Sequence, residues 1–238
     1  MVVDCMTRSF LVPRGSDVPL EIKIAEPALR AQGLSLTTWT SSFVLASLLH
    51  KLPVDFPPSS SPIQVLELGA GTGLVGLTAA ALWNVPIVLT DLAPIVPGLA
   101  GNVKLNDSLV KDRVRCGSLD WAAPDNLTLQ TGETYSADTS KACVILAADT
   151  VYSEEHPELL SKAILRWLDR GSSSRVILTY PLRVAYLDQI RQLWELLEAG
   201  GLEAIQEGRE QASADDWDDE GLCEWSVWAW KRIQENGE

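Results

Sequence analysis

The stretch Glu67-Leu68-Gly69-Ala70-Gly71-Thr72-Gly73 decides the fold of this 238-residue chain. It follows a short apolar run at 63–68 and precedes an apolar, alanine-rich run at 74–83. In a strand–turn–helix context, glycines allow a tight turn and a close approach of the backbone to a ligand. Asp91 ends the next apolar run, about 20 residues on, where a carboxylate can accept hydrogen bonds from ribose hydroxyls. The pattern predicts a site for a ribose-containing ligand.

Short apolar runs alternate with helical patterns along the rest of the chain. We expect strands at 63–68, 86–90, 114–116, 143–148 and 175–180, and helices at 38–49, 74–83, 95–105, 157–168 and 184–197. Strands that are apolar on both faces and alternate with helices predict a doubly wound parallel sheet, in which ligands bind beyond the carboxyl ends of the strands. We also expect a closing pair of strands at 202–205 and 223–230, and a long loop at 122–140.

The chain is expected to form one domain behind an N-terminal extension. Residues 1–35 make up the extension, in which the alternating run L-E-I-K-I at 20–24 predicts a short strand. Residues 36–238 make up the ligand-binding domain. A composition that is 46% hydrophobic is sufficient for one sizeable core.

The net charge of −13 disfavours binding to nucleic-acid phosphates and favours basic protein partners, although acidity also serves solubility. The acidic run at 215–220 could dock a basic partner or be a solvated loop. No secretory leader or membrane-spanning run is visible, so we expect a cytoplasmic protein, with a nuclear fraction left open. Four scattered cysteines and two histidines predict neither a disulfide framework nor a metal site.

The glycines alone do not distinguish between two cofactors. Gly71-x-Gly73-x-x-Gly76 also fits the G-x-G-x-x-G pattern of NAD enzymes. Glu67, however, ends the first strand, where a carboxylate could meet an aminium group, and Gly69 follows that strand directly. No Tyr-x-x-x-Lys pair follows. These details favour S-adenosylmethionine over NAD.

Four motifs carry a resemblance to a known family. The run at 67–76, E-L-G-A-G-T-G-L-V-G, resembles motif I of the seven-β-strand methyltransferases, and residues 36–232 follow the order of elements of that superfamily. Thr38-Trp39-Thr40-Ser41, Leu119-Asp120-Trp121 and Asp149-Thr150-Val151-Tyr152 are similar to motifs of the methyltransferase-like protein-lysine methyltransferases. The first motif is specific to the superfamily only, and the other three narrow the resemblance to the family.

The resemblance implies a fold and a set of roles. The fold is α/β and Rossmann-like: a doubly wound, mostly parallel seven-stranded sheet with an antiparallel last strand and helices on both faces. The glycine run and Glu67 would line the methionine end of the cofactor, Asp91 would bind the ribose, and Asp120 and Trp121 would lie at the adenine. The implied cofactor-binding residues are Trp39, Glu67, Gly69, Ala70, Gly71, Gly73, Asp91, Leu92, Asp120, Trp121 and Ala148.

The acceptor that the resemblance implies is a lysine on another protein, such as a translation elongation factor or a chaperone. Asp149 would accept a hydrogen bond or proton from the lysine amine, and the Tyr152 ring would pack on its stem. Alternatively, Asp149 caps the next segment and Tyr152 is a core ring. His156 is expected to be a helix-start residue.

Other functions remain open from the residues. Nucleic-acid amine methyltransferases carry an Asn/Asp-Pro-Pro-aromatic turn where this chain has Asp149-Thr150-Val151-Tyr152. Small-molecule methyltransferases often add a lid domain. An NAD oxidoreductase and a non-catalytic binding module are further alternatives. We expect a monomer that binds a protein substrate and neither nucleic acid nor membrane.

Overall fold

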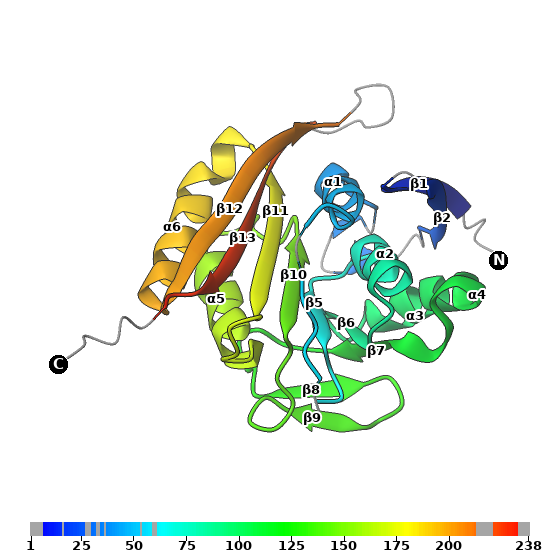
Figure 1. The fold of residues 1–238 in the computed structure, drawn as a ribbon, viewed down its shortest axis with the longest axis horizontal. Coiled ribbons are helices and arrows are strands. Elements are labelled where there is room, and N and C mark those ends of the chain that lie inside the picture. Colours follow the sequence, from blue (N-terminus) through cyan, green and yellow to red (C-terminus); the bar gives the residue numbers. More distant parts are fainter. Residues whose placement is uncertain are drawn as a thin grey trace.

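The computed structural model describes residues 7–15, 17–26, 30–31, 34–35, 37–52, 54–58, 61–212 and 221–232. Its centre is a nine-stranded sheet with the strand order β12-β13-β11-β10-β5-β6-β7-β8-β9 (Figure 1). The five parallel strands are β5 (Val65–Leu68), β6 (Ile87–Asp91), β7 (Val114–Ser118), β10 (Val144–Ala148) and β11 (Arg175–Pro181). Next to them, β13 (Leu222–Trp230) runs antiparallel to both β11 and β12 (Leu202–Gln211). The predicted α/β fold, with a mostly parallel sheet and an antiparallel last strand, is confirmed.

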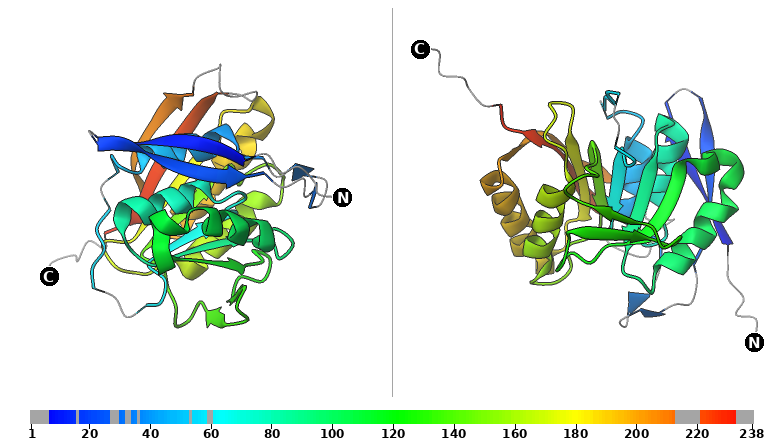
Figure 2. Two further views of the ribbon diagram at one scale, coloured as in Figure 1. Left: turned by 90° about the vertical axis from the view of Figure 1, so that its right-hand side faces the viewer. Right: turned by 90° about the horizontal axis from the view of Figure 1, so that it is seen from below.

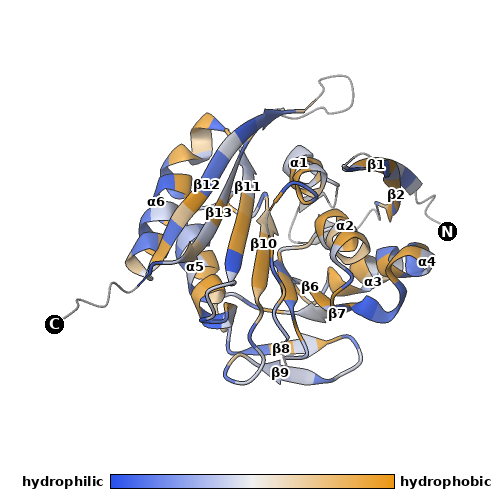
Figure 3. Ribbon diagram, in the orientation of Figure 1, coloured by the Kyte–Doolittle hydropathy of each residue, from blue (hydrophilic) through white to orange (hydrophobic). Residues whose placement is uncertain are grey.

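Helices cover both faces of the sheet (Figure 2). One face carries α5 (His156–Trp167) and α6 (Leu187–Ala199), and the other carries α1 (Thr40–Leu48), α2 (Leu74–Trp83) and α3 (Val96–Leu105). Successive strand residues point to opposite faces, so Val65 lies in one core cluster and Leu66 in the other. The central strands are correspondingly mostly apolar (Figure 3). Single turns of helix complete the chain: α4 (Asp107–Val110), η1 (Lys111–Arg113) and η2 (Val184–Tyr186).

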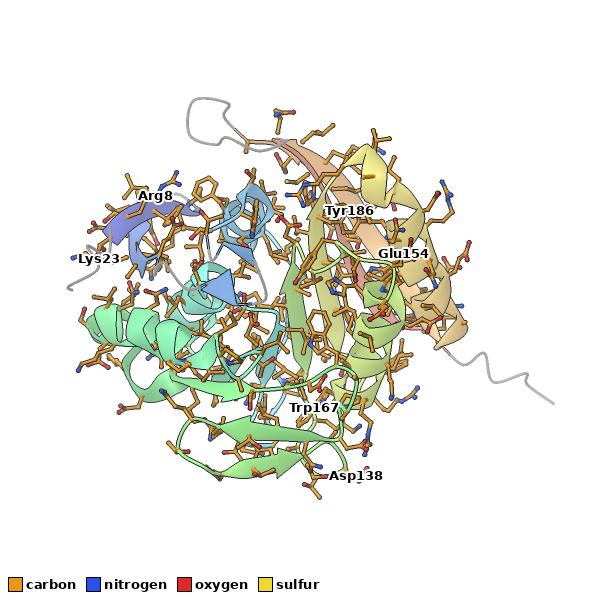
Figure 4. All side chains as sticks on the ribbon, turned by 180° about the vertical axis from the view of Figure 1, so that it is seen from behind. Arg8, Lys23, Asp138, Glu154, Trp167 and Tyr186 are labelled. Atoms are coloured by element: carbon orange, nitrogen blue, oxygen red, sulfur yellow. The ribbon has the colours of Figure 1, made fainter. Side chains whose placement is uncertain are left out.

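The segment 122–140 is not the long loop that we expected. It forms the hairpin of β8 (Asn126–Leu129) and β9 (Thr134–Ser136), which pairs with β7 and raises the strand number from seven to nine. The buried side chains of Leu127, Leu129 and Tyr135 explain the pairing, because together they join the core. Trp167, labelled in Figure 4, fixes the start of the segment by donating from Nε1 to the Pro124 carbonyl at 2.6 Å.

The N-terminal extension contains more structure than the short strand predicted at 20–24. A hairpin joins β1 (Thr7–Arg14) to β2 (Asp17–Ala25), and a two-residue pair, β3 (Arg30–Ala31) with β4 (Leu34–Ser35), follows. Phe10, Val12 and Ile22 are buried against the helices of one sheet face. The alternation in β1 is interrupted by polar residues and Pro13, so the pattern was too weak to predict a strand.

Asn102 of α3 and Asn106, the C-cap of that helix, hold the hairpin against the domain. Asn102 accepts a hydrogen bond from the Ala25 N–H at 2.8 Å and donates to the Ala25 carbonyl at 3.1 Å. Asn106, one helical turn later, accepts from the Lys23 N–H at 2.9 Å and donates to the Lys23 carbonyl at 2.7 Å. The two amides therefore take the place of a neighbouring strand, satisfying the outer backbone edge of β2.

Candidate active site

The loops after β5, β6, β7, β10 and β11 meet at the carboxyl edge of the sheet, as the topology requires. Strand order puts the loop after β5 between those after β6 and β10. All the sequence-predicted site residues lie in these loops, at the ends of these strands, or at the start of α1. Glu154 and Tyr186, labelled in Figure 4, mark the segments that follow β10 and β11 on one side of the molecule.

The glycine loop leaves backbone exposed at one position and is tightly packed at another. Gly71 has a φ of +53°, and a Cβ built on it would meet nothing within 4 Å. Gly69 has a φ of +64°, and its Cβ would lie 2.9 Å from the Thr150 methyl group and 3.3 Å from the Trp121 ring. Gly69 is thus needed for packing, whereas Gly71 faces open space in which a ligand could contact the backbone.

Asp91 closes one side of this space. Its Oδ2 accepts a hydrogen bond from the Gly71 N–H at 2.8 Å, and its Oδ1 accepts from the Leu92 N–H at 2.7 Å. Burial raises the pKa of Asp91, and these two backbone donors oppose the rise. The side chain of Leu92 is exposed beside it. A partly accessible carboxylate next to an open glycine backbone can receive a pair of hydroxyl groups.

Glu67 lies below the loop rather than in the open space. It is 2% exposed, and its Oε2 accepts a hydrogen bond from the Gly76 N–H at 3.0 Å. Burial raises its pKa to about 8, against the effect of the Gly76 donor and with a further contribution from Asp91. The described partner of Glu67 is therefore the first turn of α2, and its predicted contact with an aminium group stays a prediction.

An aromatic wall, formed by the rings of Trp121, Tyr152 and His156, lies on the other side of the glycine loop. The Trp121 ring lies 6.0 Å from the His156 ring, and the Tyr152 ring lies 4.2 Å from it, both edge to face. His156 Nδ1 accepts a hydrogen bond from the Tyr152 N–H at 3.3 Å. Burial lowers the pKa of His156 and raises the pKa of Tyr152, so both are neutral near pH 7. His156 does start α5, as predicted, but its place between the two rings was missed.

Asp120 caps a turn at the edge of this wall. Its Oδ1 accepts a hydrogen bond from the Ala122 N–H at 2.9 Å, and the side chain is otherwise exposed. Ala148, the last residue of β10, is buried at 8% exposure. Ala70 donates its N–H to the Thr90 carbonyl at 2.9 Å, and Gly73 is the N-cap of α2. Ala70, Gly73 and Ala148 shape the loops and present backbone rather than charged groups.

Asp149 is paired with an arginine that the sequence analysis did not single out. It has a φ of +54°, is 8% exposed, and forms two hydrogen bonds with Arg183, at 2.9 and 3.1 Å. The Arg183 guanidinium also lies 5.4 Å from the centre of the Trp39 ring, which is 38% exposed. No motif marks Arg183, because its role depends on the segment after β11 passing beside the end of β10.

Two further findings concern other kinds of site. Within the described residues, no set of three or more His, Cys, Asp or Glu side chains is arranged to hold a metal ion, and no helix has the length and apolar character needed to span a membrane. The acidic run at 215–220 lies outside the described residues.

Sequence comparisons point to one family. A sequence model of a family described as lysine methyltransferase matches residues 19–191. Protein-lysine N-methyltransferase EFM2 of Saccharomyces cerevisiae is 37% identical over 82% of this chain, and rrg1 of Schizosaccharomyces pombe is 31% identical over 93%. Protein N-lysine methyltransferase METTL21A of Danio rerio is 31% identical over 73%. The matches cover 48% of EFM2, 69% of rrg1 and 72% of METTL21A, so this chain spans about half the length of EFM2.

Solved structures support the fold alone. A TehB-like S-adenosylmethionine-dependent methyltransferase from Corynebacterium glutamicum has a TM-score of 0.50 at 16% identity, covering 82% of this chain and 89% of that one. The [4+2]-cyclase SpnF has a TM-score of 0.51 at 16% identity, covering 73% and 76%. Because a cyclase and a methyltransferase match equally well, the fold does not choose the reaction, and the site residues have to do so.

Proposed function

Because the chain belongs to the lysine methyltransferase family, we propose that it transfers a methyl group from S-adenosylmethionine to a lysine side chain of another protein. The observation that carries the proposal is the set of site residues that the strand order β10-β5-β6 brings together. The open glycine loop at Gly71 lies between Asp91 on one side and the Asp149–Tyr152 segment on the other. A donor held by the loop would thus lie beside an acceptor held at the end of β10.

The residues present fit the proposed cofactor. The open space over Gly71 allows a ligand to approach the backbone, and the Asp91 carboxylate beside it suits a ribose diol. The Trp121 ring offers a flat surface for an adenine, and the exposed Trp39 at the start of α1 offers a second ring. S-adenosylmethionine would supply a methyl group already activated on a sulfonium, so the main tasks of the protein are positioning and exclusion of water.

The acceptor lysine has to be deprotonated before transfer, whereas the methyl donor is already activated. A free lysine has a pKa of about 10.4, so the neutral amine at pH 7 costs roughly 4–5 kcal/mol. With its proton released to bulk water, the lysine nitrogen would supply the lone pair for the new N–C bond, and the sulfur of S-adenosylmethionine would keep the electrons of the C–S bond that breaks. Removal of water from the amine beside the neutral rings of Trp121, Tyr152 and His156 would lower the cost of the neutral form.

We assign the acceptor site to Asp149 and Tyr152. The Asp149 carboxylate, fixed at the end of β10, would accept a hydrogen bond from the lysine amine. The Tyr152 ring is 39% exposed, so it can pack against the lysine stem while its edge stays on His156. The raised pKa of Tyr152 keeps its hydroxyl protonated, so it can donate or accept a hydrogen bond but adds no charge.

The substrate that we propose is a protein with an exposed lysine in a basic region, such as a translation elongation factor or a chaperone. The net charge of −13 supports a basic partner and disfavours nucleic acid. We further propose that the protein works as a monomer in the cytoplasm, with a nuclear fraction left open, and without a membrane partner. Light scattering on the purified protein would test the monomer.

Two experiments in sequence test the function. Calorimetric titration with S-adenosylhomocysteine and, separately, with NAD should give micromolar binding of the first and none of the second. Labelled S-adenosylmethionine added to a dialysed yeast extract, with and without nuclease, should then label a protein band, with the label on lysine by mass spectrometry. Absence of S-adenosylhomocysteine binding by folded protein would contradict the cofactor. A nuclease-sensitive label would instead indicate a nucleic-acid substrate.

A further inference from the structure

We infer that Arg183 is a positioning residue that fixes the Asp149 carboxylate and balances its charge, so that the site receives the acceptor lysine as a neutral amine. The inference rests on the proposed function, because it takes Asp149 as the group that meets the lysine. It adds a residue that no motif marks and gives it a role distinct from cofactor binding.

Arg183 and Asp149 form an ion pair with two parallel hydrogen bonds. Arg183 Nη1 lies 2.9 Å from one Asp149 oxygen and Nη2 lies 3.1 Å from the other, so the two planar groups face each other. The Asp149 side chain is 5% exposed and the Arg183 side chain is 20% exposed. Because Arg183 contacts both oxygens of Asp149, the carboxylate is held in one orientation. A single hydrogen bond would leave the carboxylate free to rotate.

A third residue, Trp39, contacts the arginine of this ion pair. The Trp39 ring lies 5.4 Å from the Arg183 guanidinium carbon, within the range of a cation–π contact. Trp39 is the N-cap of α1, whereas Asp149 follows β10 and Arg183 follows β11. The three side chains therefore connect three segments that are far apart in the sequence, and they do so at the carboxyl edge of the sheet, where the proposed site lies.

The charge of the pair matters for the acceptor. An isolated buried carboxylate would attract a lysine ammonium and raise the pKa of the lysine, which opposes transfer. Paired with Arg183, Asp149 carries no net charge as a unit yet keeps oxygen lone pairs that can accept a hydrogen bond. The amine can then be oriented without being held as a cation.

The surrounding ionisable groups do not take over this role. Asp91, at the end of β6, is the other carboxylate that acts on Tyr152 alongside Asp149, and it would face the cofactor ribose. Tyr152, after β10, and His156, on α5, are neutral near pH 7. Trp39, from α1, contributes a ring face without a charge. Among these facing groups, Arg183 is the cation that offsets Asp149.

Three variants test the inference. Arg183→Met removes the positive charge and the two N–H donors to Asp149 but keeps much of the apolar part of the side chain. Arg183→Lys keeps the charge but loses the two-point contact. Arg191→Met is the matched control, because Arg191 also pairs with an aspartate, Asp188, at 2.7 Å but on an exposed face. Each is compared with the full wild-type chain for labelling of the yeast-extract band from pH 6.5 to 10, and for S-adenosylhomocysteine affinity by calorimetry.

We expect Arg183→Met to lower the labelling rate at pH 7.5 at least tenfold and to move the acid side of the pH profile upward by about 1–2 units, the size of shift that an uncompensated neighbouring charge causes. Its affinity for S-adenosylhomocysteine should stay within about threefold of wild type, and Arg183→Lys should restore the pH profile but not the full rate. Arg191→Met should match wild type throughout.

The possible failures are distinguishable. If wild-type protein labels no protein band, the proposed function fails and the inference fails with it. If wild type labels the band and Arg183→Met loses rate equally at every pH, in proportion to a loss of cofactor affinity, Arg183 is merely structural and the inference alone is overturned. Full activity of Arg183→Met would overturn it in the same way.

Discussion

The hydroxyl oxygens of Thr38 and Thr72 lie 2.9 Å apart in a buried position and share a hydrogen bond. Thr72 belongs to the glycine loop, and Thr38 directly precedes Trp39, so the bond joins the start of α1 to the proposed cofactor site. The Thr72 carbonyl also accepts a hydrogen bond from Asn102 at 2.9 Å. Asn102 pairs with Ala25, and the neighbouring Glu26 accepts from the Thr38 N–H at 2.8 Å. The bonds close a ring that runs through the hairpin, α1, the glycine loop and α3.

This ring predicts that Asn102 matters for the cofactor and Asn106 does not. Asn102→Ala removes bonds to both Ala25 and Thr72, so we expect about 1–3 kcal/mol of lost stability and about a tenfold weaker binding of S-adenosylhomocysteine. Asn106→Ala removes the bonds to Lys23 of the hairpin and to the Asn102 carbonyl but none to the glycine loop. It should cost similar stability and leave the affinity within about twofold. Urea unfolding and calorimetry measure the two quantities.

Equal losses of affinity in the two asparagine variants would contradict the ring, because they would show that hairpin docking alone controls binding. An unchanged affinity in Asn102→Ala would show that the glycine loop holds its shape without the hairpin.

Two conservative variants test the proposed acceptor site. Asp149→Asn keeps the size of the side chain but removes its charge, and Tyr152→Phe removes only the hydroxyl group. We expect both to abolish transfer to protein, because the amine loses the charged carboxylate in one variant and the hydroxyl group beside it in the other, while S-adenosylhomocysteine binding stays nearly intact. Labelling of the extract band and calorimetry give the two readouts. Full transfer activity in both variants would show that these residues only shape the core.

Much of the central sheet could be predicted because the pattern that indicates each strand lies within a few consecutive residues. The strands β5, β6, β10 and β11 are mostly apolar, as expected for strands covered on both faces, and turn residues bound them. The glycine loop was predictable for the same reason, since strand, turn and helix follow each other directly. The hairpins β1–β2 and β8–β9 were not predicted, because their alternation is short and their burial depends on helices distant in the sequence.

The partners of the site residues could not be predicted, because they are brought together only by the fold. Asp149 was found by its place after a strand, but nothing in the sequence indicates that Arg183 reaches it. Glu67 was expected to face the cofactor, whereas its described hydrogen bond runs to Gly76. A sequence motif identifies a residue and the strand that carries it. The direction of the side chain depends on the pleat of the strand and on the neighbouring loops, which the motif does not contain.

Two glycines that both have a positive φ but lie in different surroundings test the ligand site. Both Gly71 and Gly132 have positive φ, at +53° and +90°, and a Cβ on either would meet nothing within 4 Å. Substitution by alanine should therefore cost about 1–2 kcal/mol of stability in each case. Only Gly71→Ala should also weaken S-adenosylhomocysteine binding, by tenfold or more, since Gly132 lies in the turn between β8 and β9. Equal affinities by calorimetry would mean that the ligand does not approach Gly71.

Glu67 gives the structure a pH-dependent stability whose sign follows from its burial. Its pKa is raised from 4.5 to about 8 in the folded state, chiefly by burial. The folded protein therefore holds this proton more tightly than the unfolded chain, and the resulting stability is full below pH 4.5 and is lost as the pH rises towards 8. Glu67→Gln keeps a hydrogen-bond acceptor for the Gly76 N–H but cannot ionise. We expect the variant to match wild type near pH 5 and to exceed it by up to about 4 kcal/mol near pH 9. Urea unfolding at pH 5, 7 and 9 measures the difference, and a difference that stays constant across this range would show that Glu67 does not change its protonation on folding.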